Sequence, residues 1–261
     1  MTHTTVLIKY EGTIEEAESK VAQLLEPYDE NKECEERKDF LGESDLKRMA
    51  KHYNVSLDQI NALQELLLHM EDWDGTPGGI ENGKLYKTTT HNEKCKWDWW
   101  TIGGRWGGKL ILKPTTQGIV YSREPGPVYR PATPHVATVG TDVALLKDVD
   151  FEAMGIARRA RAEEDWEALS KLAPDNPLRR FEYDAERDET KEHYIARHSA
   201  PFTTHAVLIE GQEWIEPSEM GWFGCDHDRT EDAATWAQNF QQRFLSNPTD
   251  TTVIVVVDYH I

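Results

Sequence analysis

The sequence predicts an α+β protein whose sheet takes strands from both ends of the chain. Three runs rich in β-branched and apolar residues support this prediction: Thr4–Tyr10, Thr203–Glu210 and Thr251–His260. The last run is almost continuously apolar, which is typical of a central strand buried on both faces. Helical patterns lie between the runs, so we expect one mixed or antiparallel sheet with helices packed against it.

Two amphipathic helices are expected to cover this sheet. The first follows Thr13, which with Glu16 three residues later has the form of a capping box. The second spans Thr230–Leu245 and carries aromatic residues at helical spacing, including Trp236 and Phe240. Each helix lies next to a predicted strand in the sequence, which favours packing on the sheet.

The middle of the chain has a different composition. We predict a single α+β domain over residues 1–261, in which about residues 40–200 form a helical and loop-rich insertion. Two helices within it, Ser44–Tyr53 and Leu57–Met70, have the spacing of a helix-turn-helix. The second lacks Lys and Arg, which argues against direct binding to duplex nucleic acid.

Charge is distributed unevenly along the chain. The net charge is −18, yet residues 96–135 contain six basic and only two acidic side chains. An acidic exterior favours attraction of a basic protein partner, whereas the basic segment favours an anionic ligand. Neither an apolar signal segment nor a run of 18 apolar residues is present, so we expect a cytoplasmic protein.

The basic segment contains a stretch rich in tryptophan and glycine, Lys96–Gly108. Indole rings can stack on a planar group, and a guanidinium can bind phosphate through two hydrogen bonds. The alternative is a tryptophan-rich structural core in which Arg105 pairs with a structural carboxylate such as Asp98. The predicted ligand-binding residues are Trp97, Asp98, Trp99, Trp100, Gly103, Gly104, Arg105, Trp106 and Trp222.

Asp258 and His260 are the predicted catalytic residues. Residues i and i+2 of a strand share a face, so Asp258 could orient His260 as a general base. The alternative is that they only mark the polar end of an apolar strand. No pattern identifies a cofactor, and the cluster Cys225–Asp228 lacks the spacing of known zinc sites, so no metal ligand is predicted.

Four motifs resemble those of an uncharacterised family of bacteriophage and bacterial proteins. They are Glu71–Gly75, Lys96–Trp100 with Gly103–Trp106, Glu219–Gly224, and Val257–Ile261. The resemblance implies a phage or mobile-element setting, hence the host cytoplasm, and it carries no established activity. It also implies a Cys at the position of Tyr259, so this chain's Tyr argues against a thiol nucleophile there.

Two functional hypotheses follow. The first is an acidic phage or mobile-element accessory protein that binds a basic host protein, such as a defence or nucleic-acid-handling component. The second is an enzyme or binding protein for a small phosphorylated or nucleotide-like ligand, in which Arg105, Asp258 and His260 share one cleft. The sequence leaves open whether the protein is an enzyme.

Overall fold

The computed structural model describes residues 3–121, 135–137, 140–173, 176, 190–220, 226–227 and 233–260. The chain divides into two compact units, of which unit 1 comprises Met1–Glu26 with Trp97–Ile261 and unit 2 comprises Pro27–Lys96. Helices and strands occur together, which confirms the predicted α+β class. The prediction that about residues 40–200 form one insertion stays a prediction.

A seven-stranded sheet forms the centre of unit 1. Its strands are β1 (His3–Glu11), β5 (Trp99–Ile102), β6 (Gly118–Val120), β7 (His135–Ala137), β8 (Val143–Leu145), β9 (Ala206–Ile209) and β12 (Thr252–His260). Their order is β7-β6-β8-β12-β1-β9, with β5 pairing with β12. The sheet is mixed, as predicted, because β1 runs parallel to β9 and antiparallel to β12.

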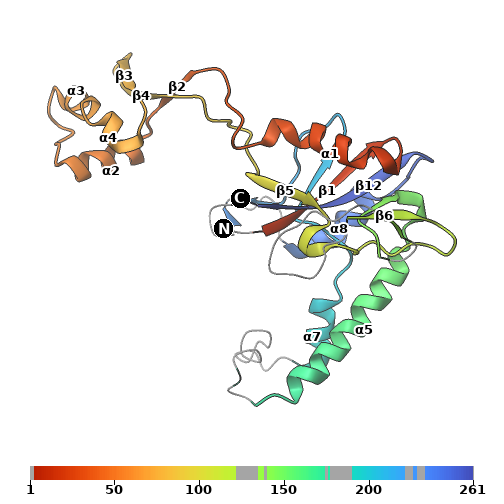
Figure 1. Cartoon of the computed structure of the whole chain (residues 1–261). Helices are drawn as coiled ribbons and strands as arrows, with labels where there is room; N and C mark the ends of the chain where they lie inside the picture. Colours follow the sequence, from red (N-terminus) through yellow and green to blue (C-terminus); the bar gives the residue numbers. More distant parts are fainter. Residues whose placement is uncertain are drawn as a thin grey trace. The chain divides into compact units, whose positions relative to one another are not determined.

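Strand β12 is the central strand, as the sequence predicts. All nine of its residues are buried, and it pairs along one edge with β1 and along the other with β8 and β5. Figure 1 shows β12 beside β1 and β5. Its β-branched side chains suit a strand packed on both faces, and this position brings the two ends of the chain together.

Four helices and several short 3₁₀ helices accompany this sheet in unit 1. The helices are α1 (Ala17–Leu25), α5 (Phe151–Ser170), α7 (Lys191–His198) and α8 (Ala233–Phe244), and the 3₁₀ helices are η1 (Ile14–Glu16), η2 (Glu26–Tyr28), η3 (Gly104–Trp106) and η4 (Leu146–Asp148). α5 and α7 pack against each other and extend away from the sheet (Figure 1). α1 and α8 lie over opposite faces (Figure 1). Phe240 and Phe244 of α8 pack in one core with Ile254 and Val256 of β12.

The predicted capping box before α1 is present, since the Thr13 amide donates to Oε2 of Glu16 at 2.9 Å.

Beyond α7, strands β10 (Glu219–Met220) and β11 (Asp226–His227) form a separate two-stranded pair.

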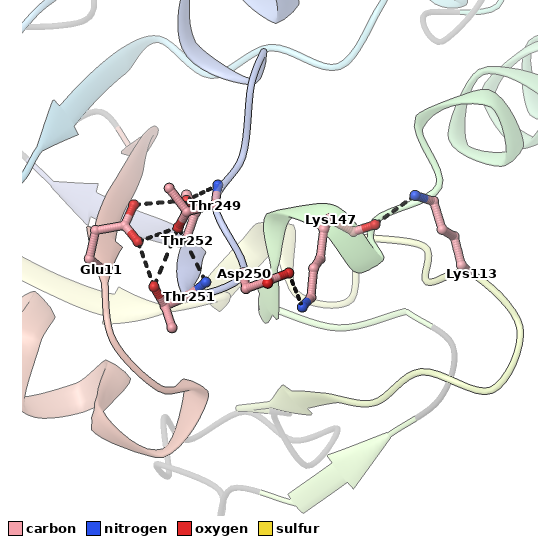
Figure 2. Close-up of polar contacts among 7 residues, drawn as sticks. All are labelled: Glu11, Lys113, Lys147, Thr249, Asp250, Thr251 and Thr252. Carbon is pink, nitrogen blue, oxygen red and sulfur yellow. Dashed lines mark hydrogen bonds and ion pairs between the residues drawn. The ribbon is translucent and has the colours of Figure 1, made fainter.

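A cluster of hydroxyl groups holds the start of β12 against the end of β1. Thr249 and Thr251 donate to Oε2 of Glu11, and Thr252 donates to Oε1 at 2.8 Å. Figure 2 shows this cluster with the neighbouring ion pair between Lys147 and Asp250, 2.8 Å long. The contacts of Glu11 with the threonines fix the pairing of β1 with β12 at the end opposite to His3 and His260.

Unit 2 has its own sheet and core. Its antiparallel sheet is ordered β2-β4-β3, with β2 (Arg37–Phe40), β4 (Lys84–Thr89) and β3 (Gly78–Glu81). Its helices are α2 (Glu43–Tyr53), α3 (Ala62–Leu67) and α4 (Met70–Asp74). Met49, Leu66, Met70 and Leu85 are fully or almost fully buried and form the centre of its core.

One helix differs from the sequence-based expectation. The predicted helix Leu57–Met70 is instead a turn followed by the short helices α3 and α4. In the ranges that the structure describes, no helix is sufficiently long and apolar to cross a membrane.

Candidate functional site

The candidate site lies where β1, β5 and β12 meet at the end of β12. Residues of β12 alternate between the two faces, so Asp258 and His260 share the face on which Val256 packs against α8. His260 is paired in register with His3 of β1 and with Trp99 of β5. Three strands therefore bring these side chains to one place.

A buried carboxylate at Asp258 holds His3. The Asp258 side chain is fully buried, and its Oδ1 lies 2.9 Å from Nδ1 of His3. Its Oδ2 accepts a hydrogen bond of 2.9 Å from the backbone amide of Arg105. An ionised carboxylate only accepts, so Nδ1 of His3 is the donor. Both oxygens thus have donors, as burial of a charge requires.

A second carboxylate, Asp98, holds His260 in the same way. Nδ1 of His260 lies 2.6 Å from Oδ1 of Asp98, and the Asp98 amide donates to the backbone oxygen of His260 at 3.0 Å. The Asp98 side chain is 37% exposed, whereas that of His260 is 11% exposed. This pair therefore reaches solvent through Asp98, while His260 is largely enclosed.

The two histidines are close neighbours with the same orientation toward their carboxylates. Their ring centroids lie 5.1 Å apart at an interplanar angle of 62°. Each binds its carboxylate through Nδ1, and no described residue makes a hydrogen bond with either Nε2. Proton donation from Nδ1 fixes the tautomer in which Nε2 carries the free lone pair. Two imidazole nitrogens of the cluster thus keep a free lone pair.

The glycines of the predicted loop shape the backbone around two buried carboxylates. Gly103 and Gly104 have φ of +70° and +56°, in the left-handed region that favours glycine. A Cβ on Gly104 would overlap the Asp258 side chain, and a Cβ on Gly103 would lie 2.5 Å from Oδ2 of Asp142. Asp142 accepts from the amides of Gly108 and Tyr121. The nearby carboxylates therefore give a structural reason for glycine at positions 103 and 104.

The tryptophans of the loop lie in different parts of unit 1. Trp99 lies near the histidines, with its ring 5.7 Å from that of His3. Trp97 donates from Nε1 to the Leu25 carbonyl at the end of α1 and packs edge-on against Trp100. Trp106 packs against the core beneath α8. Only Trp99 therefore contacts the histidine cluster, and Trp222 lies outside the described residues.

Arg105 is brought to the cluster through its backbone. Its amide binds Asp258, two residues before His260 on β12. Its side chain is exposed, and its guanidinium makes no hydrogen bond or ion pair with any residue in the described part of the chain. The alternative pairing of Arg105 with Asp98 is not observed, because Asp98 contacts His260 instead.

The observed acid–histidine pairs differ from the one expected. Asp258 contacts His3 rather than His260. Sequence reasoning missed His3 because its role depends on the register between β1 and β12. No group of three or more His, Cys, Asp or Glu side chains in the described ranges is arranged to hold a metal ion.

Searches with family models, among curated proteins and among solved structures returned no match for this chain. Its function is therefore inferred from the chemistry of its own residues.

Proposed function

We propose that this protein binds a small phosphorylated or nucleotide-like ligand at the His3–His260 cluster and cleaves a phosphoester bond in it. The observation that carries the proposal is the pair of neighbouring imidazoles, each oriented by a carboxylate through Nδ1. Cleavage of a phosphoester needs a base for the attacking hydroxyl and an acid for the leaving oxygen. Two histidines side by side can supply both.

The proton balance is simple. Nε2 of one neutral histidine takes a proton from the attacking water or hydroxyl while a new P–O bond forms. Nε2–H of the other, protonated histidine gives a proton to the leaving oxygen as the old P–O bond breaks. Asp258 and Asp98 hold the two rings and stabilise whichever imidazolium is present. Turnover then requires proton exchange with water to restore the starting states.

Neighbouring groups suit the binding of such a ligand. The backbone amide of Arg105 contacts Asp258, while its side chain is exposed. A guanidinium matches the geometry of phosphate oxygens. Trp99, half-buried beside His3, offers a surface for a base or sugar. We therefore assign anion binding to Arg105 and packing on the ligand to Trp99.

Hydrolysis of bis(p-nitrophenyl) phosphate and of 2′,3′-cyclic nucleotides tests the proposal. His3→Ala and His260→Ala should each lower kcat by about 10²–10⁴-fold, as expected for loss of a general acid or base. His193→Asn, at an exposed position of α7, is the matched control and should retain the activity. No hydrolysis of either ester class by the wild-type protein, together with no binding, would contradict the proposal.

A second proposal is that the protein is a phage or mobile-element accessory protein that binds a basic host protein. The net charge of −18 supports it. The fully exposed Ile60 and the 81% exposed Leu68 of unit 2 supply apolar contact area. Capture from host lysate tests it: a partner should be retained at low salt and released near 0.5 M salt. Absence of any salt-sensitive partner would contradict it.

A further inference from the structure

Unit 2 contains a cavity of about 400 Å³ beside the end of β4. Its lining residues come from three segments, 30–36, 76–77 and 88–91. Backbone hydrogen bonds join these segments, since the Thr88 amide donates to the Pro77 carbonyl at 2.8 Å and the Cys34 amide donates to the Thr90 carbonyl at 2.8 Å. The walls of the cavity are therefore fixed by the backbone of one unit.

The charge of the lining is mainly negative. Glu30, Glu33 and Glu36 all line the cavity, against one Lys or Arg side chain, that of Lys32. The three carboxylates make no ion pair or hydrogen bond with any residue in the ranges that the structure describes. The next cation along the chain, Arg37, is already paired with Glu93 at 2.8 Å. This cavity therefore favours a cationic ligand.

A hydroxyl group of the lining also lacks a partner. Oγ1 of Thr76 is buried and makes no hydrogen bond within the described part of the chain. A buried hydroxyl without a partner costs free energy, so a donor that reached it would stabilise the bound state. Thr88–Thr90 place three more hydroxyl groups on the lining segments. The cavity thus suits a ligand that carries several hydrogen-bond donors as well as a positive charge.

We propose that this cavity receives an arginine side chain of a basic protein partner. The proposal rests on the second function proposed above, binding of a basic host protein, and names its anchoring contact. A guanidinium has five donors in a planar fork, so it can bind a carboxylate through two hydrogen bonds and still donate to a hydroxyl. Its aliphatic stem can pack on Pro77 and on the threonine methyl groups.

NMR titration of the isotope-labelled full chain tests the site with three peptides. They are acetyl-Gly-Arg-Arg-Gly-amide, its lysine counterpart, and its citrulline counterpart, which keeps the shape of arginine without the charge. The arginine peptide should shift the amide resonances of Thr88–Thr90 saturably. The lysine peptide should bind severalfold more weakly because an ammonium cannot form the bidentate contact. The citrulline peptide should leave these resonances unshifted.

Matched variants separate this site from the general acidity of the chain. Replacing both lining carboxylates, Glu33→Gln with Glu36→Gln, should weaken binding of the arginine peptide severalfold. Glu35→Gln is the control, because Glu35 is exposed in the same segment and does not line the cavity. It should bind like the wild type.

Capture from host lysate distinguishes failure of this site from failure of the proposed function. A salt-sensitive partner should be lost by the Glu33 and Glu36 double variant and retained by Glu35→Gln. A partner retained equally by both variants, or equal resonance shifts with the arginine and lysine or citrulline peptides, would overturn the arginine site and leave host-protein binding standing. Absence of any salt-sensitive partner would contradict host-protein binding itself, and with it this anchoring contact.

Discussion

His3 and His260 are direct register partners on β1 and β12, and their ring centroids lie 5.1 Å apart. Each ring is held from its Nδ1 side by a carboxylate, Asp258 for His3 and Asp98 for His260. The carboxylates differ in burial, since Asp258 is inaccessible while the Asp98 side chain is 37% exposed. This difference lets mutation test a role of Asp258 in stability separately from the proposed role of Asp98 in orienting His260.

Asp98→Asn should lower kcat for the proposed phosphoester hydrolysis with little loss of stability. An amide at this position can donate to Nδ1 of His260 and so favour the wrong tautomer, which lowers kcat by about 10²-fold or more in oriented imidazoles. Partial exposure of Asp98 allows water to satisfy the amide. Steady-state hydrolysis with urea unfolding measures both effects. An unchanged kcat would show that Asp98 does not orient His260.

Asp258→Asn should instead destabilise the fold. The Asp258 carboxylate accepts from the Arg105 amide and contacts His3 in a site without solvent, and loss of hydrogen bonds to a buried charge costs about 2–3 kcal/mol. Asp250→Asn is the control, because the Asp250 side chain is 93% exposed, and it should unfold like the wild type. Equal unfolding midpoints for the two variants would contradict a structural role for Asp258.

Gly104→Ala should destabilise unit 1. The residue has φ of +56°, and an added Cβ would overlap the Asp258 side chain. The backbone strain alone costs about 1–2 kcal/mol, and displacement of Asp258 adds to it. Gly155→Ala in α5, where an added Cβ meets nothing within 4 Å, should stabilise by about 0.5–1 kcal/mol. Thermal unfolding compares the stabilities of the two variants. A Gly104→Ala variant as stable as the wild type would contradict the close packing of Gly104 against Asp258.

Glu11 should contribute stability that depends on pH. Hydrogen bonds from Thr249 and then Thr252 lower the pKa of Glu11 in the folded protein. A carboxyl whose folded pKa is depressed stabilises above its unfolded pKa, and this stability is lost as the pH falls. Glu11→Gln should therefore lower Tm at pH 7, and this difference should disappear near pH 3. Glu15→Gln, at an exposed position of η1, should show no such trend.

Tyr259→Phe should leave the protein as stable or more stable. The side chain is fully buried, and its hydroxyl has no hydrogen-bond partner in the part of the chain that the structure describes. Removal of a buried hydroxyl without a partner gains about 1 kcal/mol. Urea unfolding measures this gain. Destabilisation by more than 1 kcal/mol would mean that the hydroxyl makes a contact essential to the fold.

The sequence predicted the main elements because their signals are local. The β-branched run of β12, the capping box of Thr13 and the aromatic spacing of α8 each depend on residues close together in the chain. The candidate site depends instead on strand register. His3 meets Asp258 across 255 positions and His260 meets Asp98 across 162, and a shift of one residue would send these side chains to opposite faces.

The glycine and tryptophan stretch illustrates the same limit. Its composition indicated a shaped loop, and Gly103 and Gly104 do adopt left-handed conformations. That these glycines make room for Asp142 and Asp258 could not be predicted, because both carboxylates come from distant strands or loops. Composition also could not predict that Trp99 lies beside His3 while Trp97 and Trp100 pack against each other.

The central claim is that His3 and His260 act on one ligand, and an NMR titration of their imidazole resonances tests it most directly. A nucleoside 3′-monophosphate is added to the isotope-labelled protein while all histidine signals are followed. We expect the His3 and His260 resonances to shift together with a single Kd, the His193 resonance not to shift, and Arg105→Ala to weaken binding. Unshifted His3 and His260 resonances at millimolar ligand would contradict joint binding by the two histidines.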